Sequence, residues 1–309
     1  MINSPLEKLR KIKKLNDRTV KITKRNAVLT LANGSTYIIL MALSVVFLVP
    51  FLYIATQSLM SSQDLANPNV QWIPKYITFD NYKFAFQILE YPRRLALSAF
   101  ITMVSMFGQL FSCSFVAYGI SRIKFKGAGV LFSIIMFTMI IPPQSIIVSQ
   151  YLMFSKYEML DSYLPVILPC FFALGLNGGM FIFLFRQFFK SIPNELENAA
   201  YIDGSGIMGT YFRVIIPNSG AAILVVTILS TIWQWNNFFE PSVYVTDVSK
   251  YTLTMLLSDL GSQAAQINLW VNNGVDLAAT FLCLFPLLLL FFFLQKKFIK
   301  GIETTGLAN

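Results

Sequence analysis

Long uninterrupted runs of apolar residues recur along the chain, and six of them are long enough to cross a bilayer as a helix. The runs cover residues 35–57, 94–120, 128–153, 162–185, 214–233 and 277–295. Because they are continuous rather than alternating, they favour helices over a β-barrel. Prolines in the third, fourth and sixth runs indicate bent helices, either around a cavity or from packing alone. The pattern therefore predicts an all-α integral membrane protein with six transmembrane helices.

The composition agrees with a membrane protein and excludes the main soluble classes. Hydrophobic residues make up 55% and charged residues 13% of the 309 residues, against roughly 25% charged residues in an average globular protein. So few charges could not cover a soluble fold of this size. No Asp, Glu, Lys or Arg lies well inside a predicted span, whereas ion-coupled carriers usually keep such a residue in the membrane. This absence argues against a pump and fits a passage for a neutral, hydrogen-bonding solute.

Residue types that carry most enzyme and metal chemistry are missing or scattered. The chain has no His, and its cysteines Cys113, Cys170 and Cys283 lie far apart within apolar runs. Such cysteines are typical of small core residues rather than of a disulfide framework or a metal cluster. No GxxxxGK[ST] phosphate-binding loop occurs. We therefore expect no catalytic residue, metal site or nucleotide site on this chain, and energy for any active process would come from another subunit.

The positive charges are unevenly distributed between the connections. Eighteen of the 24 Lys and Arg residues fall in the N-terminal segment, the second-to-third and fourth-to-fifth connections and the C-terminal tail. With six spans these regions share one side, and an excess of cations marks the cytoplasmic side. We therefore predict that both termini are cytoplasmic. Residues 1–34 form a basic cytoplasmic segment, which is either a solvated tail or an amphipathic helix on the inner leaflet, and no nucleic-acid partner is expected.

The connection between the fourth and fifth spans, residues 191–217, has the pattern of two short helices. Pro193 and Asn194 provide a start, and Glu197 follows Asn194 by the three residues of a capping box. Gly204 provides a stop. Apolar residues then recur every four positions up to the fifth span. Acidic residues on an otherwise basic face suggest a compact contact with a cytoplasmic partner.

This loop resembles the EAA loop of binding-protein-dependent ABC importer permeases, whose pattern is roughly E-A-A-x-x-D-G-x(8)-I-x-L-P. The matching positions are Ala199, Ala200, Asp203, Gly204, Ile215 and Pro217. Asn198 departs, because the family usually has Glu there. In such permeases the loop forms the coupling helix that docks in a groove of the ATPase subunit. The resemblance implies this role for Glu195, Glu197, Asn198, Ala199, Ala200, Asp203, Gly204 and Pro217, with Glu195 or Glu197 available to replace the missing Glu.

Further motifs extend the resemblance over residues 35–309. They are W-I-P at 72–74, D-N-Y at 80–82, I-P-P-Q at 141–144, F-R-Q-F-F-K-S-I-P at 185–193, W-N-N-F at 235–238, Y-T-L at 251–253 and F-I-K-G at 298–301. They are similar to segments of carbohydrate-uptake permeases, and the last is similar to the end of the maltose-type second permease subunit. The resemblance implies the type I ABC importer permease fold, with residues 35–309 as a six-helix permease domain.

The resemblance also implies a function. The chain would be a permease subunit in a bacterial cytoplasmic membrane that takes up a sugar or oligosaccharide by alternating access. Its implied partners are a second permease, two cytoplasmic ATPases that bind ATP and Mg²⁺, an extracytoplasmic solute-binding protein and the surrounding membrane lipid. Candidates for the substrate path are Gln144, Asn177, Gln234 and Asn237. The alternatives left open are a peptide, amino acid or other small solute as substrate, a membrane-embedded enzyme, and a scaffold that recruits a cytoplasmic protein.

Overall fold

The computed structural model describes residues 34–267 and 273–306, and the regular elements in these ranges are all helical. The chain divides into two units, Met1–Gln57 and Ser58–Asn309. In the first unit, the helix Gly34–Gln57 has 24 residues and is apolar enough to cross a membrane. The predicted basic segment 1–34 lies outside the described residues except for Gly34.

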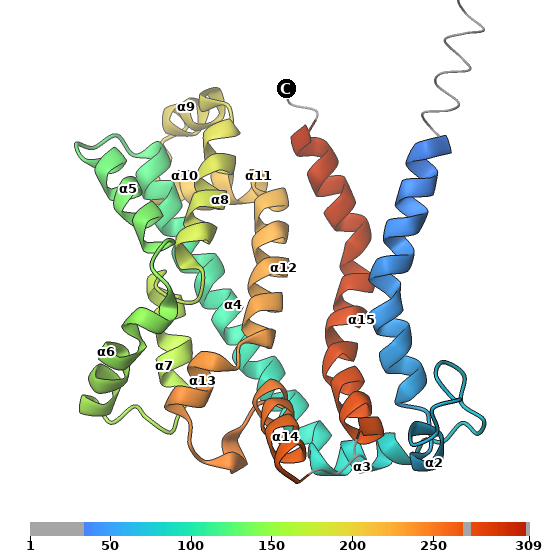
Figure 1. Ribbon diagram of the computed structural model, residues 1–309. Coiled ribbons are helices and arrows are strands. Elements are labelled where there is room, and N and C mark those ends of the chain that lie inside the picture. The colour runs from blue at the N-terminus through green and yellow to red at the C-terminus, as the bar shows by residue number, and fades with distance from the viewer. Residues whose placement is uncertain (1–33, 268–272, 307–309) are drawn as a thin grey trace, which may run out of the picture. The chain divides into compact units, whose positions relative to one another are not determined.

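The second unit consists of helices joined by short connections (Figure 1). Its α-helices are α2 Ser62–Leu65, α3 Asp80–Ile88, α4 Tyr91–Arg122, α5 Ala128–Thr138, α6 Pro143–Lys156, α7 Leu164–Ile167, α8 Gly178–Ser191, α9 Asn194–Ile202, α10 Ile207–Thr210, α11 Ile216–Asn218, α12 Gly220–Asn236, α13 Phe239–Tyr244, α14 Leu253–Ile267 and α15 Asn273–Gly306. Two 3-10 turns (Leu168–Phe172 and Val248–Lys250) and a π turn (Tyr211–Ile215) also occur. At one end of the unit lie α9, α10, α11 and the C-terminal end of α15, and at the other end lie α2, α3 and α14 (Figure 1).

The central helix of this unit is α4, whose 32 residues pack against α8 and α12. The shared core includes Cys113, Phe181, Phe185, Tyr211 and Val226. A glycine on α4 permits a close approach, because a Cβ at Gly108 would lie 2.9 Å from the Phe171 ring. Helices in a membrane associate through such small residues and through interhelical hydrogen bonds. The fold is therefore organised around α4.

Neutral polar side chains link α4 to its neighbours. Gln109 donates through Nε2 to the Leu176 carbonyl at 2.6 Å and accepts from the Ser230 hydroxyl at 2.6 Å. The Ser112 hydroxyl donates to the Cys170 carbonyl at 2.6 Å. These are the interhelical hydrogen bonds expected between membrane helices. Their buried groups therefore already have partners within the fold.

The long helix α15 contains Pro286, and neighbouring side chains compensate for it. A proline has no backbone N–H, so the carbonyl four residues before it in a helix loses its donor. For Pro286 this is the carbonyl of Leu282. The Tyr91 hydroxyl donates to this carbonyl at 3.1 Å, and the Trp235 indole donates to the next carbonyl, that of Cys283, at 3.1 Å. The helix therefore continues through its proline, and the sixth predicted span is a single helix.

The structure bears out the helical prediction but divides the predicted spans differently. Single long helices are Gly34–Gln57, Tyr91–Arg122 and Gly274–Lys296. Two further runs are bent: Ala128–Thr138 meets Pro143–Lys156 at 97°, and Ile207–Asn218 meets Gly220–Asn236 at 78°. The described residues therefore contain three to five candidate spans, and the count of six stays a prediction.

The run 162–185 is not one helix, contrary to its apolar pattern. After α7 the chain forms the 3-10 turn Leu168–Phe172, and α8 begins only at Gly178. Pro165 and Pro169 remove backbone donors in this region. Ala173 and Asn177 both have a φ of 59°, which is incompatible with a continuous right-handed helix. Hydropathy identified the apolar run, but these backbone constraints decide where it breaks.

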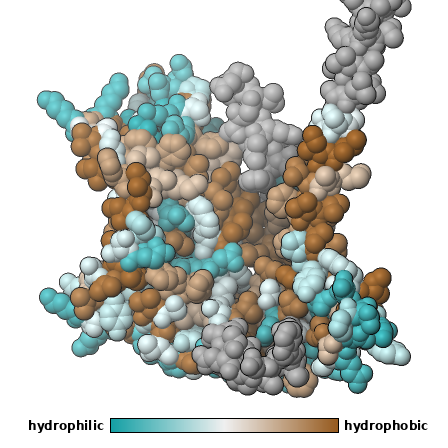
Figure 2. Space-filling view, in the orientation of Figure 1, coloured by the Kyte–Doolittle hydropathy of each residue, from teal (hydrophilic) through white to brown (hydrophobic). Residues whose placement is uncertain are grey.

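Part of the surface of the second unit is strongly apolar. On α5 the exposed side chains include Val130, Leu131, Ile134 and Phe137. Figure 2 shows apolar side chains over α5 and α8 and hydrophilic ones over α9. Soluble monomers rarely expose contiguous apolar patches of this kind. This surface is therefore suited to lipid or to another membrane protein.

Candidate functional site

The two-helix element predicted for residues 191–217 is present, and α9 is its first helix. Its N-cap is Pro193, which has an extended backbone. Just after its end, Gly204 has a φ of 81°, a conformation that is open to glycine but costly for residues with a Cβ. The Ser205 amide then donates to the Ala200 carbonyl at 2.9 Å, which closes the helix end. Both limits of α9 are thus fixed by backbone chemistry.

The capping box predicted from Asn194 and Glu197 is wrong. Asn194 is the first helical residue rather than the cap, and no side chain caps this helix. Both side chains instead contact Arg122, the last residue of α4. The Arg122 Nε lies 3.0 Å from Glu197 Oε1, and Nη1 donates to Asn194 Oδ1. The first turn of α9 is therefore held by tertiary contacts.

The same guanidinium also closes the end of α8. Its Nη2 donates to the carbonyls of Phe189 and Ile192. These carbonyls lie at a helix C-terminus, where intrahelical donors run out and a cation is favoured. The side chains of Arg122 and Glu197 are only 6% and 9% exposed. One buried group therefore joins α4, α8 and α9.

The electrostatics of this group favour a positional role. Burial raises the pKa of the Glu197 carboxyl above its ordinary value, and the nearby charge of Arg122 counteracts this only in part. Desolvation of a buried ion pair offsets most of the attraction, whereas removal of one partner is strongly unfavourable. The pair therefore fixes where α9 lies more than it adds net stability.

Two exposed apolar side chains lie on α9 among polar ones. Leu196 and Ile202 are 44% and 86% exposed, whereas Tyr201 interacts with Tyr118 of α4. Of the other residues predicted to contact a partner, Glu195, Asn198, Ala199, Asp203, Gly204 and Pro217 are exposed, and Ala200 is half-buried. Exposed apolar side chains with a polar rim are typical of protein contact sites. The arrangement holds α9 from one side and leaves its other side free for a partner.

The second part of the element is also attached to α4. The Tyr118 hydroxyl donates to the Ile207 carbonyl at the start of α10, at 3.1 Å. The hydroxyls of Ser114 and Tyr211 share a hydrogen bond of 2.7 Å. Both tyrosines are almost completely buried. The two short helices and α4 therefore form one packed body at this end of the unit.

The glycines after α9 do not make a nucleotide site. Gly204, Gly206 and Gly209 have the G-x-G-x-x-G spacing of a dinucleotide-binding loop. That motif requires a preceding strand and a following helix, but here the loop follows α9, and α10 has only four residues. Among the described residues, no three His, Cys, Asp or Glu side chains gather as metal ligands. The chemistry of this region is that of a contact surface.

The structure does not bring the four substrate-path candidates together. Gln234 and Asn237 line one small cavity of about 10 Å³ at the end of α12, which is room for a single water. Its hydroxyl side chains are Ser98, Thr102, Thr252 and Thr254. Gln144 is exposed at the start of α6, and Asn177 precedes α8; neither lines this cavity.

At the opposite end of the unit, charged groups fix the loop 245–252. Lys250 Nζ lies 2.7 Å from Asp161 Oδ2, and Asp161 Oδ1 accepts two loop amides at 3.1 and 3.0 Å. The hydrogen bond from Lys250 and those from the amides lower the pKa of Asp161 to about 2. Arg94, near the start of α4, is buried and donates to two loop carbonyls at 2.9 Å each. The loop that carries the Y-T-L motif is therefore well anchored.

Sequence reasoning missed Arg122 as a member of this site. In the sequence it is one of several basic residues after the second span, and it counted only toward the orientation of the chain. Its partner Glu197 is far away along the chain, and no local spacing connects the two. The C-terminal position of Arg122 on a helix predicts a favourable dipole interaction, but it does not identify a partner helix.

Residues 110–304 match the family described as binding-protein-dependent transport system inner membrane component. The chain is 32% identical to Protein LplC of Bacillus subtilis over 263 residues, which is 82% of this chain and 87% of that protein. It is 28% identical to the arabinooligosaccharides transport system permease protein AraQ of Bacillus subtilis over 276 residues, covering 87% and 93% of the two chains.

A solved structure has the same fold. It is the crystal structure of a bacterial ABC transporter involved in the import of the acidic polysaccharide alginate. The TM-score is 0.72 at 22% identity, and the similarity covers 87% of this chain and 96% of that one. The helical arrangement described above is therefore shared with a chain of that transporter.

Proposed function

The chain belongs to the family of binding-protein-dependent transport system inner membrane components, and we propose that it is the subunit through which an ATP-driven importer takes up a carbohydrate. Membership makes it a transport permease in a membrane. The carbohydrate is supported by the names of similar permeases, which refer to arabinooligosaccharides and galactooligosaccharides. Neutral polar groups and the absence of charge inside the predicted spans suit a solute rich in hydroxyl groups.

The observation that carries the mechanism is the attachment of α9. One side of α9 is fixed to α4 and α8 through Arg122, and the apolar side chains of Leu196 and Ile202 are exposed. In this proposal α9 is the coupling helix, and a cytoplasmic ATPase covers its outer face. Closure of two ATPases around ATP and Mg²⁺ would move α9, and the buried contacts would oblige α4 and α8 to follow.

The opposite end of α4 gives this movement a second point of action. Arg94 holds the loop 245–252 near the start of α4, as Arg122 holds α9 at its end. A helix of 32 residues is about 48 Å long at 1.5 Å per residue. A displacement of α4 would therefore act on both ends of the unit, which is what alternating access between two sides of a membrane requires.

The substrate would pass between this chain and a second, related permease. Gln234 and Asn237 are the better supported contacts, because they share a polar cavity, and Gln144 and Asn177 are weaker ones. A cavity of about 10 Å³ is far too small for a sugar. In this proposal it widens when α12 and α4 separate, after an extracytoplasmic binding protein has delivered the solute. Both chain termini would lie on the cytoplasmic side.

Uptake by the reconstituted complex tests the proposal. The tagged chain is purified in mild detergent with its companions, placed in proteoliposomes with ATP inside, and supplied with labelled oligosaccharides, amino acids and peptides. We expect ATP-dependent accumulation of an oligosaccharide. Accumulation of an amino acid or peptide instead would favour the alternative substrate class, and a complex without an ATPase would overturn the importer assignment.

A further inference from the structure

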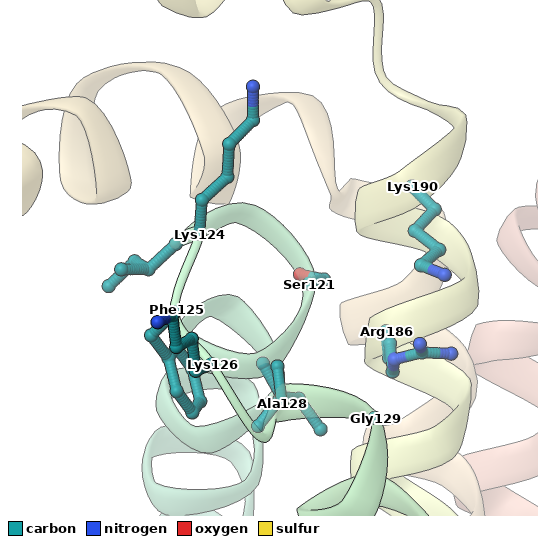
Figure 3. Close-up of a pocket in the computed structure, with 10 residues that line it drawn as sticks. Ser121, Lys124, Phe125, Lys126, Ala128, Gly129, Arg186 and Lys190 are labelled. Carbon is teal, nitrogen blue, oxygen red and sulfur yellow. The ribbon is translucent and has the colours of Figure 1, made fainter.

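A second site lies in a cavity between the α4–α5 connection and α8. The cavity has a volume of about 510 Å³. Four of its ten lining residues are cationic, namely Lys124, Lys126, Arg186 and Lys190, and none is acidic. Figure 3 shows its two walls, with the two lysines of the connection on one and Arg186 and Lys190 of α8 on the other. Such a lining creates a positive potential that attracts an anion.

Among the described residues, none of the four cations of this cavity forms an ion pair with a carboxylate. Arg186 is further fixed, because its guanidinium carbon lies 3.7 Å from the centre of the Phe132 ring. Its Nε is buried and donates no hydrogen bond within the protein. The Arg186 side chain as a whole is half-buried and lines the cavity, so its charge is available to a ligand there.

The start of α5 adds further donors. The helix begins at Ala128 after Gly127, and no side chain caps it. Its first backbone amides therefore lack intrahelical acceptors and, with the helix dipole, favour an anion. Ala128 and Gly129 line the same cavity. The helix N-terminus and the four cations thus both favour a negatively charged ligand.

The apolar surface next to the cavity identifies the class of ligand. Directly after Gly129, α5 exposes Val130, Leu131 and Ile134. The cavity itself includes Ile120, Ile123 and Phe125. A free phosphate ion or a soluble acidic protein has no use for this apolar continuation, whereas a phospholipid has acyl chains that would cover it. Basic cavities between membrane helices on the cytoplasmic side are known to hold anionic headgroups.

We infer that this cavity binds the headgroup of an anionic glycerophospholipid, whose phosphate lies among the four cations and whose acyl chains lie along α5. The charges predict that this end of the unit is cytoplasmic, where anionic lipid would be presented from the inner leaflet. The site is independent of the proposed function of α9, because it requires only that the chain be embedded in a membrane.

Native mass spectrometry of the detergent-solubilised chain tests this inference. The chain is titrated with phosphatidylglycerol or with phosphatidylcholine of the same acyl chains. We expect phosphatidylglycerol to bind more tightly, and the double variant Lys124→Ser/Lys126→Ser to weaken its binding by roughly tenfold or more, because each cation near a membrane surface contributes a factor of about five. Both lysines are exposed, so the variant should keep its fold.

The matched control removes two exposed cations from the same end of the unit, Arg213→Ser/Lys296→Ser, neither of which lines the cavity. It should bind phosphatidylglycerol as the wild type does. Equal binding of the two lipids, or equal weakening in the two variants, would overturn the inference. Sodium phosphate that displaces the lipid better than sodium chloride of the same ionic strength would instead show a site for free phosphate, and would also overturn it.

Discussion

At the scale of single residues, Arg122 explains how a short surface helix acquires a fixed position. An exposed salt bridge contributes little to stability, but this guanidinium is buried and serves three elements. It pairs with Glu197 of α9, and it supplies donors to carbonyls at the end of α8. Lysine could carry the charge but not this planar set of donors. The geometry of the guanidinium therefore matters as much as its charge.

We predict that Glu197→Gln uncouples transport. The change leaves a buried arginine without its counter-charge, and loss of one partner of such a pair costs about 3–5 kcal/mol. This is enough to displace α9. We expect ATP-driven uptake in proteoliposomes to fall by roughly tenfold or more, since 1.4 kcal/mol corresponds to about a factor of ten, while ATP hydrolysis continues. The control Glu158→Gln makes the same change at an exposed position after α6, away from α9, and should retain uptake. Equal losses in both variants would refute the role of the pair.

Gly204 permits a second test with a closely matched control. Its φ of 81° would strain an alanine by about 1–2 kcal/mol, although open space surrounds it. Gly206 also has open space but a φ of −74° that any residue adopts. We expect Gly204→Ala to reduce uptake and Gly206→Ala to leave it near the wild-type rate, with both variants present in the membrane. Similar uptake in the two variants would mean that the end of α9 tolerates strain.

At the scale of elements, the loop 245–252 has a charge-dependent anchor. The pKa of Asp161 falls from 3.8 to about 2 because Lys250 and loop amides donate to the carboxylate. A carboxyl group whose pKa is lower in the folded than in the unfolded state stabilises the fold at pH values above its unfolded-state pKa. This contribution is lost as the pH falls through the folded-state pKa. The anchor should therefore be complete above pH 3.8 and disappear toward about pH 2.

Hydrogen exchange of the loop amides checks this prediction. Their protection factors should be constant between about pH 7 and pH 5, where the carboxylate remains charged, and should decrease below pH 3.8. Asp161→Asn should lower them between about pH 7 and pH 5, and the difference from the wild type should vanish toward about pH 2. A decrease already between about pH 7 and pH 5 would contradict the assignment, because no lowered carboxyl pKa titrates there.

The sequence predicted helices well and their interruptions only in part. Continuous apolar runs predict helices because a bilayer leaves no other way to satisfy the backbone, and α4 and α15 follow this rule. Pro286 does not break α15, since Tyr91 donates to the freed carbonyl. Pro165 and Pro169 fall where the run 162–185 does break. The same residue type thus has opposite outcomes, because Pro286 lies inside a helix, whereas Pro165 and Pro169 stand in the first turns of α7 and of the 3-10 turn Leu168–Phe172.

The candidate site divides in the same way. The limits of α9 follow from Pro193 and Gly204, which act through the local backbone and are visible in sequence. The inner contacts of α9 follow from Arg122, which acts across the fold and is not. Residues with local effects can be assigned from their neighbours, whereas buried ion pairs depend on how distant helices pack.

At the scale of the whole molecule, the chain has the features of one part of an assembly. Its apolar surface on α5 suits lipid or another membrane protein, and the exposed Leu196 and Ile202 of α9 lie at the end where hydrophilic groups gather. In the isolated chain, water would surround these two apolar side chains. In the proposed complex the ATPase covers them, so their exposure would decrease on assembly.

Ile202 offers the sharpest test of that assembly. It is 86% exposed at the end of α9, so Ile202→Glu should not disturb the fold of the chain. In the proposed complex, a charge there would be desolvated against the ATPase, at a cost of several kcal/mol. We expect a tagged Ile202→Glu chain to co-purify with a second permease but to lose most of the ATPase. Ile73→Glu, at a position 82% exposed between α2 and α3, should retain both partners. Retention of the ATPase by Ile202→Glu would place the docking surface elsewhere, because a partner that covers this position would have to remove the new carboxylate from water.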